Sequence, residues 1–191
     1  HIKIPLDEKE VLESINKLNH ITKYMSNTID DFRDFFASDK EKIEFKLLEQ
    51  IVPHMDSTKS IFVDLFCGGG SVYSNIADKY DEIYANDIIT DLIGIHKELV
   101  TGNLNFIETV KQICPDKNDK DGFINLRLDY NQNNSPEKLF ALMLCSHNNM
   151  LRYNKKFEYN QTWGNRSWND STEKKVNEFI NDNIKLKKYG I

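Results

Sequence analysis

Three consecutive glycines are the feature of this sequence that most directly suggests chemistry. Gly68, Gly69 and Gly70 follow the short apolar run of residues 60–66 and precede a segment that begins at Ser71. Glycine adopts positive φ without strain and lets the backbone come close to a ligand at the mouth of the following helix. A nucleotide-like ligand is the natural occupant of such a turn, although many sheets use a similar turn only for packing.

An acidic residue, Asp87, closes the next apolar segment, residues 82–86. A carboxylate at the end of that strand can accept hydrogen bonds from both hydroxyls of a ribose. The strand, the turn and the acid together predict a cofactor site. A nicotinamide dinucleotide stays open as the ligand on this pattern, although the sequence Gly-x-Gly-x-x-Gly does not occur in the chain.

The elements that position these residues follow from the apolar pattern. Residues 60–66 are short, apolar and closed by glycines, which is typical of a buried parallel strand entering a tight turn. Residues 71–80 are predicted to be helical, residues 82–86 to form a second strand, and residues 91–100 to begin another helix. This alternation predicts an α/β fold and makes up half of a doubly wound sheet.

The rest of the chain is predicted to be mainly helical. Two amphipathic stretches, residues 7–25 and 41–54, precede the sheet. Further helices are predicted at residues 104–113, 122–130, 136–150 and 171–187, and Ser135 followed by Pro136 is a favourable start for the third of them. Alternating aromatic and polar residues within 151–164 indicate a hairpin or an ordered loop.

Charge is distributed unevenly along the chain. The net charge is −5, yet residues 150–191 hold nine Lys or Arg against five Asp or Glu. This asymmetry indicates a locally basic surface for a polyanion, and a lysine-rich helix face in solvent is an equal alternative. The three cysteines and five histidines have no paired spacing, so neither a disulfide framework nor a metal site is expected. Without a signal peptide or a long apolar run, the cytoplasm is the expected compartment.

Four ordered blocks of the sequence resemble the Dam-type, or D12 class, N6-adenine-specific DNA methyltransferases. The first combines residues 64–72 with residues 84–93, and the second is residues 126–131. The third is residues 148–156, and the fourth joins Glu158, Tyr159 and Asn160 with the Trp163-Gly164 pair. The blocks occur in the family's order, so the resemblance spans roughly residues 60–190.

The resemblance implies a partial doubly wound, Rossmann-like S-adenosylmethionine-dependent methyltransferase domain with a helical target-recognition insert and hairpin. The implied division is a helical region at 1–56, a cofactor-binding half at 57–115 and a DNA target-recognition insert at 116–191. S-adenosylmethionine is the implied cofactor and double-stranded DNA the implied partner. The implied cofactor residues are Asp64, Phe66, Gly68, Gly69, Gly70, Ser71, Asp87 and Ile88; the implied DNA-binding residues are Arg152, Asn154, Lys155, Lys156, Asn160 and Arg166.

Within that resemblance, Asp87 is expected to hold the ribose and the turn at residues 66–70 to wrap the methionine moiety. Arginine on the hairpin suits guanine edges and lysine suits phosphates. The family usually has glycine at the position of Phe157 and proline at the position of Thr162, so the recognised DNA sequence is open.

The tetrapeptide Asp-Pro-Pro-Tyr, with which this family holds the adenine amine, is absent, because none of the four prolines is adjacent to another. We therefore expect a missing C-terminal catalytic half and no turnover by this chain alone. A non-catalytic DNA- or cofactor-binding subunit of a split or degenerate methyltransferase is the main alternative. A nicotinamide oxidoreductase is a weaker one.

Several polar and aromatic residues have two interpretations. Arg127, Tyr130 and Asn131 either brace the insert or contact the DNA backbone. Asn148 and Asn149 either belong to the recognition segment or cap a helix. The aromatic residues Tyr153, Tyr159 and Trp163 are expected to pack a small core rather than to insert into the duplex.

Overall fold

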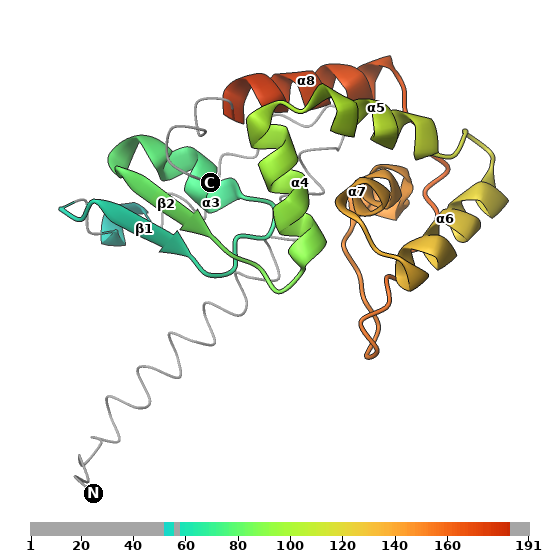
Figure 1. Cartoon of the computed structure of the whole chain (residues 1–191), viewed down its shortest axis with the longest axis horizontal. Helices are drawn as coiled ribbons and strands as arrows, with labels where there is room; N and C mark the ends of the chain where they lie inside the picture. The colour runs from blue at the N-terminus through green and yellow to red at the C-terminus, as the bar shows by residue number, and fades with distance from the viewer. Residues whose placement is uncertain (1–51, 56–57, 184–191) are drawn as a thin grey trace, which may run out of the picture.

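The computed structural model describes residues 52–55 and 58–183 (Figure 1). The helix predicted at 7–25, most of the helix predicted at 41–54 and the end of the helix predicted at 171–187 lie outside the described residues. Within them, Val52–His54 forms the short 3-10 helix η1.

A two-stranded parallel sheet carries the glycine-rich turn. Strand β1 (Ile61–Asp64) pairs with strand β2 (Glu82–Ala85), with Ile61 opposite Glu82 and Asp64 opposite Ala85. The connection between them contains helix α3 (Ser71–Ile76) and the 3-10 helix η2 (Ala77–Lys79). The predicted strand, helix and strand are therefore confirmed, and the helix predicted at 71–80 is α-helical only as far as Ile76.

Five further α-helices follow the sheet: α4 (Thr90–Thr101), α5 (Leu104–Ile113), α6 (Lys120–Gln132), α7 (Pro136–Cys145) and α8 (Asp170–Asn183). Side chains cap four of them, since Asn103, Asp119, Ser135 and Asn169 accept backbone N–H groups of the first turn. The predicted cap at Ser135 with Pro136 in the first turn is thus confirmed. Among the described residues, none of the helices has the length and apolar content to cross a membrane.

Helix α7 ends earlier than the sequence predicts. We expected it to reach about residue 150, but Ser146 is extended, with φ −79° and ψ 162°. A 3-10 turn, η3 (His147–Asn149), follows, and Asn148 and Asn149 both have positive φ. The backbone of Gly164 explains this end, because its N–H donates to the Cys145 carbonyl at 2.9 Å. That carbonyl is one of the last of α7 and has no N–H partner within the helix.

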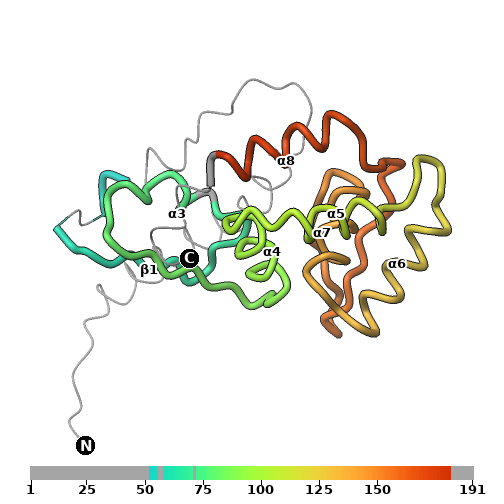
Figure 2. Tube along the Cα trace, turned by 45° about the horizontal axis from the view of Figure 1, so that its top comes forward, coloured from blue at the N-terminus to red at the C-terminus, as the bar shows by residue number. Residues whose placement is uncertain are grey.

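The larger hydrophobic core surrounds α7. Every residue from Leu139 to Cys145 is buried, and α7 packs against α4, α5 and α6 (Figures 1 and 2). A smaller core, which includes Tyr73, Ile76 and Ile83, lies beneath the sheet. Helix α4 lies between the two, since it contributes Ile95 to the larger core and Val100 to the smaller one. The larger core thus includes residues from both sides of the domain boundary expected near residue 115. That boundary stays a prediction.

One face of the sheet is not covered by the described residues. Ile61, Val63 and Tyr84 are each more than half exposed on it. Leu65 and Phe66, which follow β1, are exposed as well. Parallel strands in α/β proteins usually have both faces covered, so this apolar face is suited to contact with further elements.

Candidate functional site

The glycine-rich turn has the backbone conformation that only glycine adopts freely. Gly68 has φ 48° and Gly70 has φ 83°, both in the left-handed region. The turn is tied to the sheet by the Cys67 N–H, which donates to the Asn86 carbonyl at 2.9 Å. A Cβ added to Gly70 would lie 2.7 to 2.8 Å from atoms of the Tyr73 ring. A side chain at this position would therefore both strain the backbone and collide with a buried ring.

A buried histidine, His96, forms hydrogen bonds with this turn and with helix α3. His96 Nε2 lies 2.7 Å from the Gly68 carbonyl, and Nδ1 lies 2.9 Å from the Tyr73 hydroxyl. Because a carbonyl only accepts, Nε2 carries the proton and Nδ1 accepts from Tyr73, which is the neutral form of the ring. Burial lowers the pKa of His96 and favours that neutral form. No local pattern in the sequence indicates this role, because the partners of His96 lie 23 and 28 positions away.

Asp87 lies directly against the glycine turn. Its Oδ2 accepts the Gly68 N–H at 3.2 Å, and its Oδ1 accepts the Ile89 N–H at 3.0 Å. The side chain is partly exposed, and among the described residues it forms no salt bridge. A carboxylate oxygen has about two lone-pair sites, so each oxygen can accept one more hydrogen bond. Asp87 can therefore accept hydrogen bonds from hydroxyl groups of a ligand.

Asp64 brings a second carboxylate to the same edge of the sheet. Its Oδ1 accepts the Phe66 N–H at 3.4 Å, whereas its Oδ2 is buried and has no hydrogen-bond partner among the described residues. Burial is the main cause that raises the pKa of Asp64; the charge of Asp87 adds to it, and the backbone N–H groups of Phe66 and Tyr73 oppose it. A buried acceptor without a donor is costly, so this oxygen is suited to a donor group on a ligand.

The remaining residues predicted to contact the cofactor lie close to these two carboxylates in the sequence. Phe66 and Ile88 are 59% and 75% exposed, so each presents an apolar side chain next to the turn. Gly69 is part of the turn, and Ser71 is the first residue of α3. The structure thus collects the predicted set at the carboxyl ends of the two parallel strands, which is where open α/β sheets bind ligands.

The predicted hairpin is present as a narrow loop between α7 and α8. Tyr153 and Tyr159 form an antiparallel bridge, and the Asn160 N–H donates to the Arg152 carbonyl at 2.9 Å. The hairpin projects below α7 in Figure 1, away from the main body of the chain. Its exposed cations are Arg152, Lys155 and Lys156.

The two asparagines predicted to bind DNA, Asn154 and Asn160, are less exposed than these cations. Asn154 holds the tip of the hairpin, because its Oδ1 accepts the N–H groups of Lys156 and Glu158 at 2.8 and 3.0 Å. Its Nδ2 donates to the Glu158 carboxylate at 2.7 Å. Asn160 has a buried Oδ1 without a hydrogen-bond partner among the described residues.

Phe157 occupies a backbone position that suits glycine. Its φ is 59°, and its side chain is 69% exposed at the tip of the hairpin. A left-handed residue with a large side chain is a backbone outlier. The glycine usual at this position in the resembling family therefore has a conformational reason, and this chain retains the conformation with a bulky aromatic residue.

Side chains of α6 brace the hairpin. Arg127 donates to the Gln161 carbonyl at 3.1 Å. Asn131 exchanges two hydrogen bonds with the Tyr159 backbone, at 2.8 and 3.0 Å. The bracing interpretation of these two residues is therefore confirmed. The packing interpretation of the aromatic residues is confirmed as well, since Tyr159 is buried and Tyr153 and Trp163 pack against the larger core.

A buried network joins the hairpin to α4. The Tyr130 hydroxyl donates to Asp91 Oδ2 at 2.9 Å and lies 2.9 Å from the Tyr153 hydroxyl. The Asn134 side-chain amide donates to the same oxygen of Asp91 at 2.9 Å. Asp91 follows Asp87 by four positions, so the network connects the neighbourhood of the glycine turn with the hairpin. Asp91 was not among the predicted functional residues, although an acid in the first turn of a helix is visible in the sequence.

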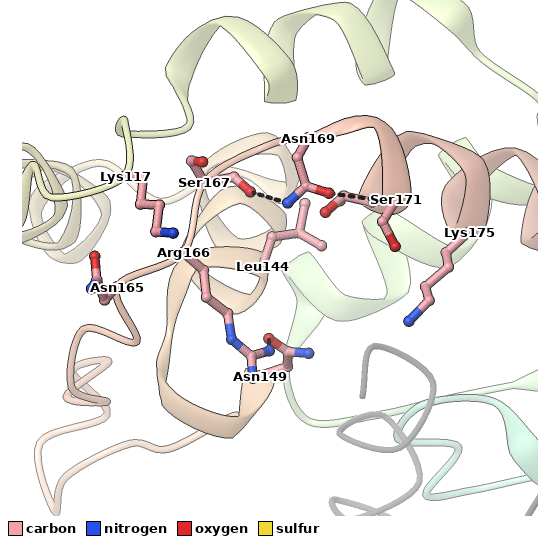
Figure 3. Close-up of a pocket in the computed structure, with 10 residues that line it drawn as sticks. Lys117, Leu144, Asn149, Asn165, Arg166, Ser167, Asn169, Ser171 and Lys175 are labelled. Carbon is pink, nitrogen blue, oxygen red and sulfur yellow. Dashed lines mark hydrogen bonds between the residues drawn. The ribbon is translucent and has the colours of Figure 1, made fainter. Parts of the chain in front are cut away.

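Arg166 lies apart from the hairpin tip. It donates to the buried Asn149 side chain at 2.8 Å, and both residues line a cavity near the start of α8 (Figure 3). Gly164, two positions earlier, passes so close to the backbone of Ser146 that an added Cβ would overlap its carbonyl oxygen. The Trp163-Gly164 pair therefore fixes the path of the chain that leads to Arg166.

Comparisons with known proteins bear on this geometry. The family model of D12 class N6 adenine-specific DNA methyltransferases matches residues 45–190. The modification methylase StsI of Streptococcus sanguinis is 30% identical over 149 residues, which are 75% of this chain and 22% of that protein. The type II methyltransferase M.FokI of Planomicrobium okeanokoites is 32% identical over 142 residues, 71% of this chain and 22% of that protein. The chain spans about a fifth of the length of these relatives. Because the family model matches well over half of the residues, this chain belongs to the D12 class N6 adenine-specific DNA methyltransferases.

Proposed function

We propose that this chain is the cofactor-binding and target-recognition portion of a site-specific DNA adenine N6-methyltransferase that uses S-adenosylmethionine. The observation that carries the proposal is the contact between Asp87 and the positive-φ glycine turn, in a chain whose family match covers residues 45–190. That arrangement combines a close backbone approach with a carboxylate that still has acceptor capacity.

The residues at the turn fit the chemical groups of this cofactor. S-adenosylmethionine, when bound, supplies a methyl group on a positively charged sulfur. Asp87 accepts hydrogen bonds from the ribose hydroxyls. Oδ2 of Asp64, which has no hydrogen-bond partner among the described residues, accepts a hydrogen bond from the ammonium group of the methionine moiety. Phe66 and Ile88 offer exposed apolar surface to the adenine ring. Gly68, Gly69, Gly70 and Ser71 bring the backbone to the ligand.

The hairpin is the proposed contact with double-stranded DNA. Arg152 can hydrogen-bond guanine edges, while Lys155 and Lys156 can neutralise phosphates. All three are exposed on a loop held in shape by Asn154 and braced by α6. Asn160 and Arg166 complete the proposed set, and Arg166 contacts phosphate rather than a base edge.

The methyl transfer itself is assigned to residues outside this sequence. The chain lacks Asp-Pro-Pro-Tyr and spans about a fifth of the length of its relatives. The uncovered sheet face with Ile61, Val63 and Tyr84 suits packing against a catalytic half that carries this tetrapeptide. The 191-residue chain alone is therefore expected to transfer no methyl group to DNA, and tritium incorporation from labelled cofactor by this chain alone would contradict that assignment.

Calorimetry with S-adenosylhomocysteine and with NAD tests the cofactor assignment. We expect S-adenosylhomocysteine to bind and NAD to give no binding heat. Asp87→Ala removes two charge-assisted hydrogen bonds to the ribose, which corresponds to a loss of roughly 100-fold in affinity. Asp81→Ala, at an exposed acid just before β2, is the matched control and should bind like the parent chain. Binding of NAD alone, or equal affinity in the two variants, would refute the assignment.

A further inference from the structure

A chain of three hydrogen bonds runs from the buried side of α3 to the carboxylate of Asp87. It begins at the Tyr73 hydroxyl of α3, which donates to His96 Nδ1 of α4 at 2.9 Å. His96 Nε2 donates to the Gly68 carbonyl at 2.7 Å, and the Gly68 N–H donates to Asp87 Oδ2 at 3.2 Å. Two buried side chains that no motif identified are thereby connected to the carboxylate that is proposed to hold the ribose.

These contacts hold Gly68 from both sides. Its N–H and its carbonyl belong to the two different peptide groups that flank its Cα, so anchoring both defines the backbone angles between them, including the φ of 48°. The shorter anchor is the one to His96, which is 1% exposed. The Cys67 thiol also lies 3.9 Å from this carbonyl, but a thiol is a weak donor. Helix α4 therefore has the main part in setting the position of Gly68 relative to Asp87.

A turn of three consecutive glycines depends on such anchors. Glycine adopts positive and negative φ about equally, and it loses more conformational freedom than any other residue when its backbone is fixed. A ligand that meets a turn already held in the bound conformation does not bear this entropic cost, and its affinity is higher for that reason. A buried side chain that anchors the turn can thus raise affinity without touching the ligand.

Tyr73 orients the imidazole that holds Gly68. Its ring is fully buried and meets the ring of His96 edge to face, with centroids 5.7 Å apart. Because its hydroxyl donates to Nδ1, the proton of the neutral imidazole is on Nε2, the nitrogen that faces Gly68. The same hydroxyl lies 2.7 Å from the position that a Cβ would take at Gly70. Tyr73 therefore acts on the turn at two points, through His96 at Gly68 and by direct contact at Gly70.

We propose that Tyr73 and His96 are positioning residues for the cofactor, because they hold Gly68 in the conformation in which the turn and Asp87 together receive the ribose of S-adenosylmethionine. The proposal rests on the proposed function, since it assumes that this turn binds that cofactor. Both side chains are buried, so they act through the backbone of Gly68 and not by contact with the ligand. Affinity for the cofactor then depends on a hydrogen-bond donor at the place of His96 Nε2.

Calorimetry with S-adenosylhomocysteine and the full 191-residue chain tests the proposal. His96→Leu keeps a side chain in the buried position but removes the donor to Gly68, so affinity should fall about 10-fold. His96→Gln keeps an amide N–H for the Gly68 carbonyl and should bind within about threefold of the parent chain. Val110→Ala, at a buried residue of α5 in the larger core, controls for a general loss of stability and should bind like the parent chain.

The amide proton resonance of Gly68 provides a second measurement that general destabilisation would not change. In the parent chain this proton is hydrogen-bonded to the Asp87 carboxylate, so it should resonate downfield. His96→Leu should move it upfield and His96→Gln should restore it, while the amide protons of α7 stay in place in both variants. If His96→Leu does not fold, Tyr73→Phe replaces it, since it keeps the ring and removes only the hydroxyl that orients the imidazole. That variant should lose about threefold in affinity and shift the Gly68 resonance in the same direction.

Equal affinity of His96→Leu and the parent chain would overturn the proposal, as would equal losses in His96→Leu and either His96→Gln or Val110→Ala. A Gly68 resonance that does not move in His96→Leu would overturn it as well, and in Tyr73→Phe an unchanged affinity would have the same meaning. If the parent chain itself binds no S-adenosylhomocysteine, the cofactor assignment fails and the proposal fails with it. Binding by the parent chain therefore separates the two failures.

Discussion

Replacement of Tyr130 by phenylalanine tests the buried network that joins the hairpin to α4. The ring of Tyr130 stays in contact with Tyr159, whose centroid is 6.1 Å away, so the substitution removes only the hydroxyl. That hydroxyl donates to Asp91, which is 8% exposed, and therefore accepts from Tyr153. Burial raises the pKa of Tyr130 and raises that of Tyr153 to about 12, so both hydroxyls are protonated at neutral pH.

The expected loss follows from the partners that remain. Asp91 keeps the amide of Asn134 but loses its other donor, and Tyr153 loses its acceptor. A hydrogen bond to a buried charged group contributes about 1.5 to 3 kcal/mol, so we expect Tyr130→Phe to lower the free energy of unfolding by about 2 kcal/mol. For a chain of this length that is a fall in melting temperature of roughly 4 to 8 °C.

Urea unfolding followed by tryptophan fluorescence measures this loss, because Trp163 and Trp168 both pack against the larger core. Tyr84→Phe is the matched control: its hydroxyl donates to Glu82 on the exposed sheet face, and its loss should leave the free energy of unfolding nearly unchanged. If the two variants have the same stability, the network does not stabilise the hairpin and the reasoning is wrong.

Three further predictions concern the turn and the hairpin. Gly70→Ala, with φ 83° and a clash with the Tyr73 ring, should cost at least about 2 kcal/mol in thermal unfolding and abolish S-adenosylhomocysteine binding; an unchanged melting temperature would contradict this. The lowered pKa of His96 means that the unfolded chain binds its proton first as pH falls, so stability should be complete above about pH 6.5 and decline below it. Urea midpoints should show a weaker decline in His96→Gln, and an undiminished one in the exposed control His147→Gln; equal declines would exclude His96 as the cause. Phe157→Gly relieves a φ of 59° and should raise stability by up to about 1 kcal/mol, whereas a marked loss in thermal unfolding would show that the ring is packed.

Local sequence was sufficient for the elements whose causes are local. The strand, glycine turn and helix between residues 60 and 76 were predicted because apolar runs and glycines are read directly from the chain. The cap at Ser135 was predicted for the same reason, since a hydroxyl and a proline at a helix start act within a few residues. Asp87 was predicted at the end of the second strand from the apolar pattern, whereas Asp64 was expected at the cofactor site only from the resemblance to the family.

Tertiary contacts decided what the local pattern did not contain. Helix α7 was predicted to continue to about residue 150, but the carbonyl of its last residue, Cys145, accepts the N–H of Gly164, which lies 19 positions away. Asp91 and Tyr130 are 39 positions apart, so neither residue alone indicates a buried hydrogen bond. The same holds for the cavity lined by Lys117 and Arg166, because only the folded backbone brings these residues together. The sequence determined the types and order of the groups, and the packing of α7 against its neighbours determined which of them meet.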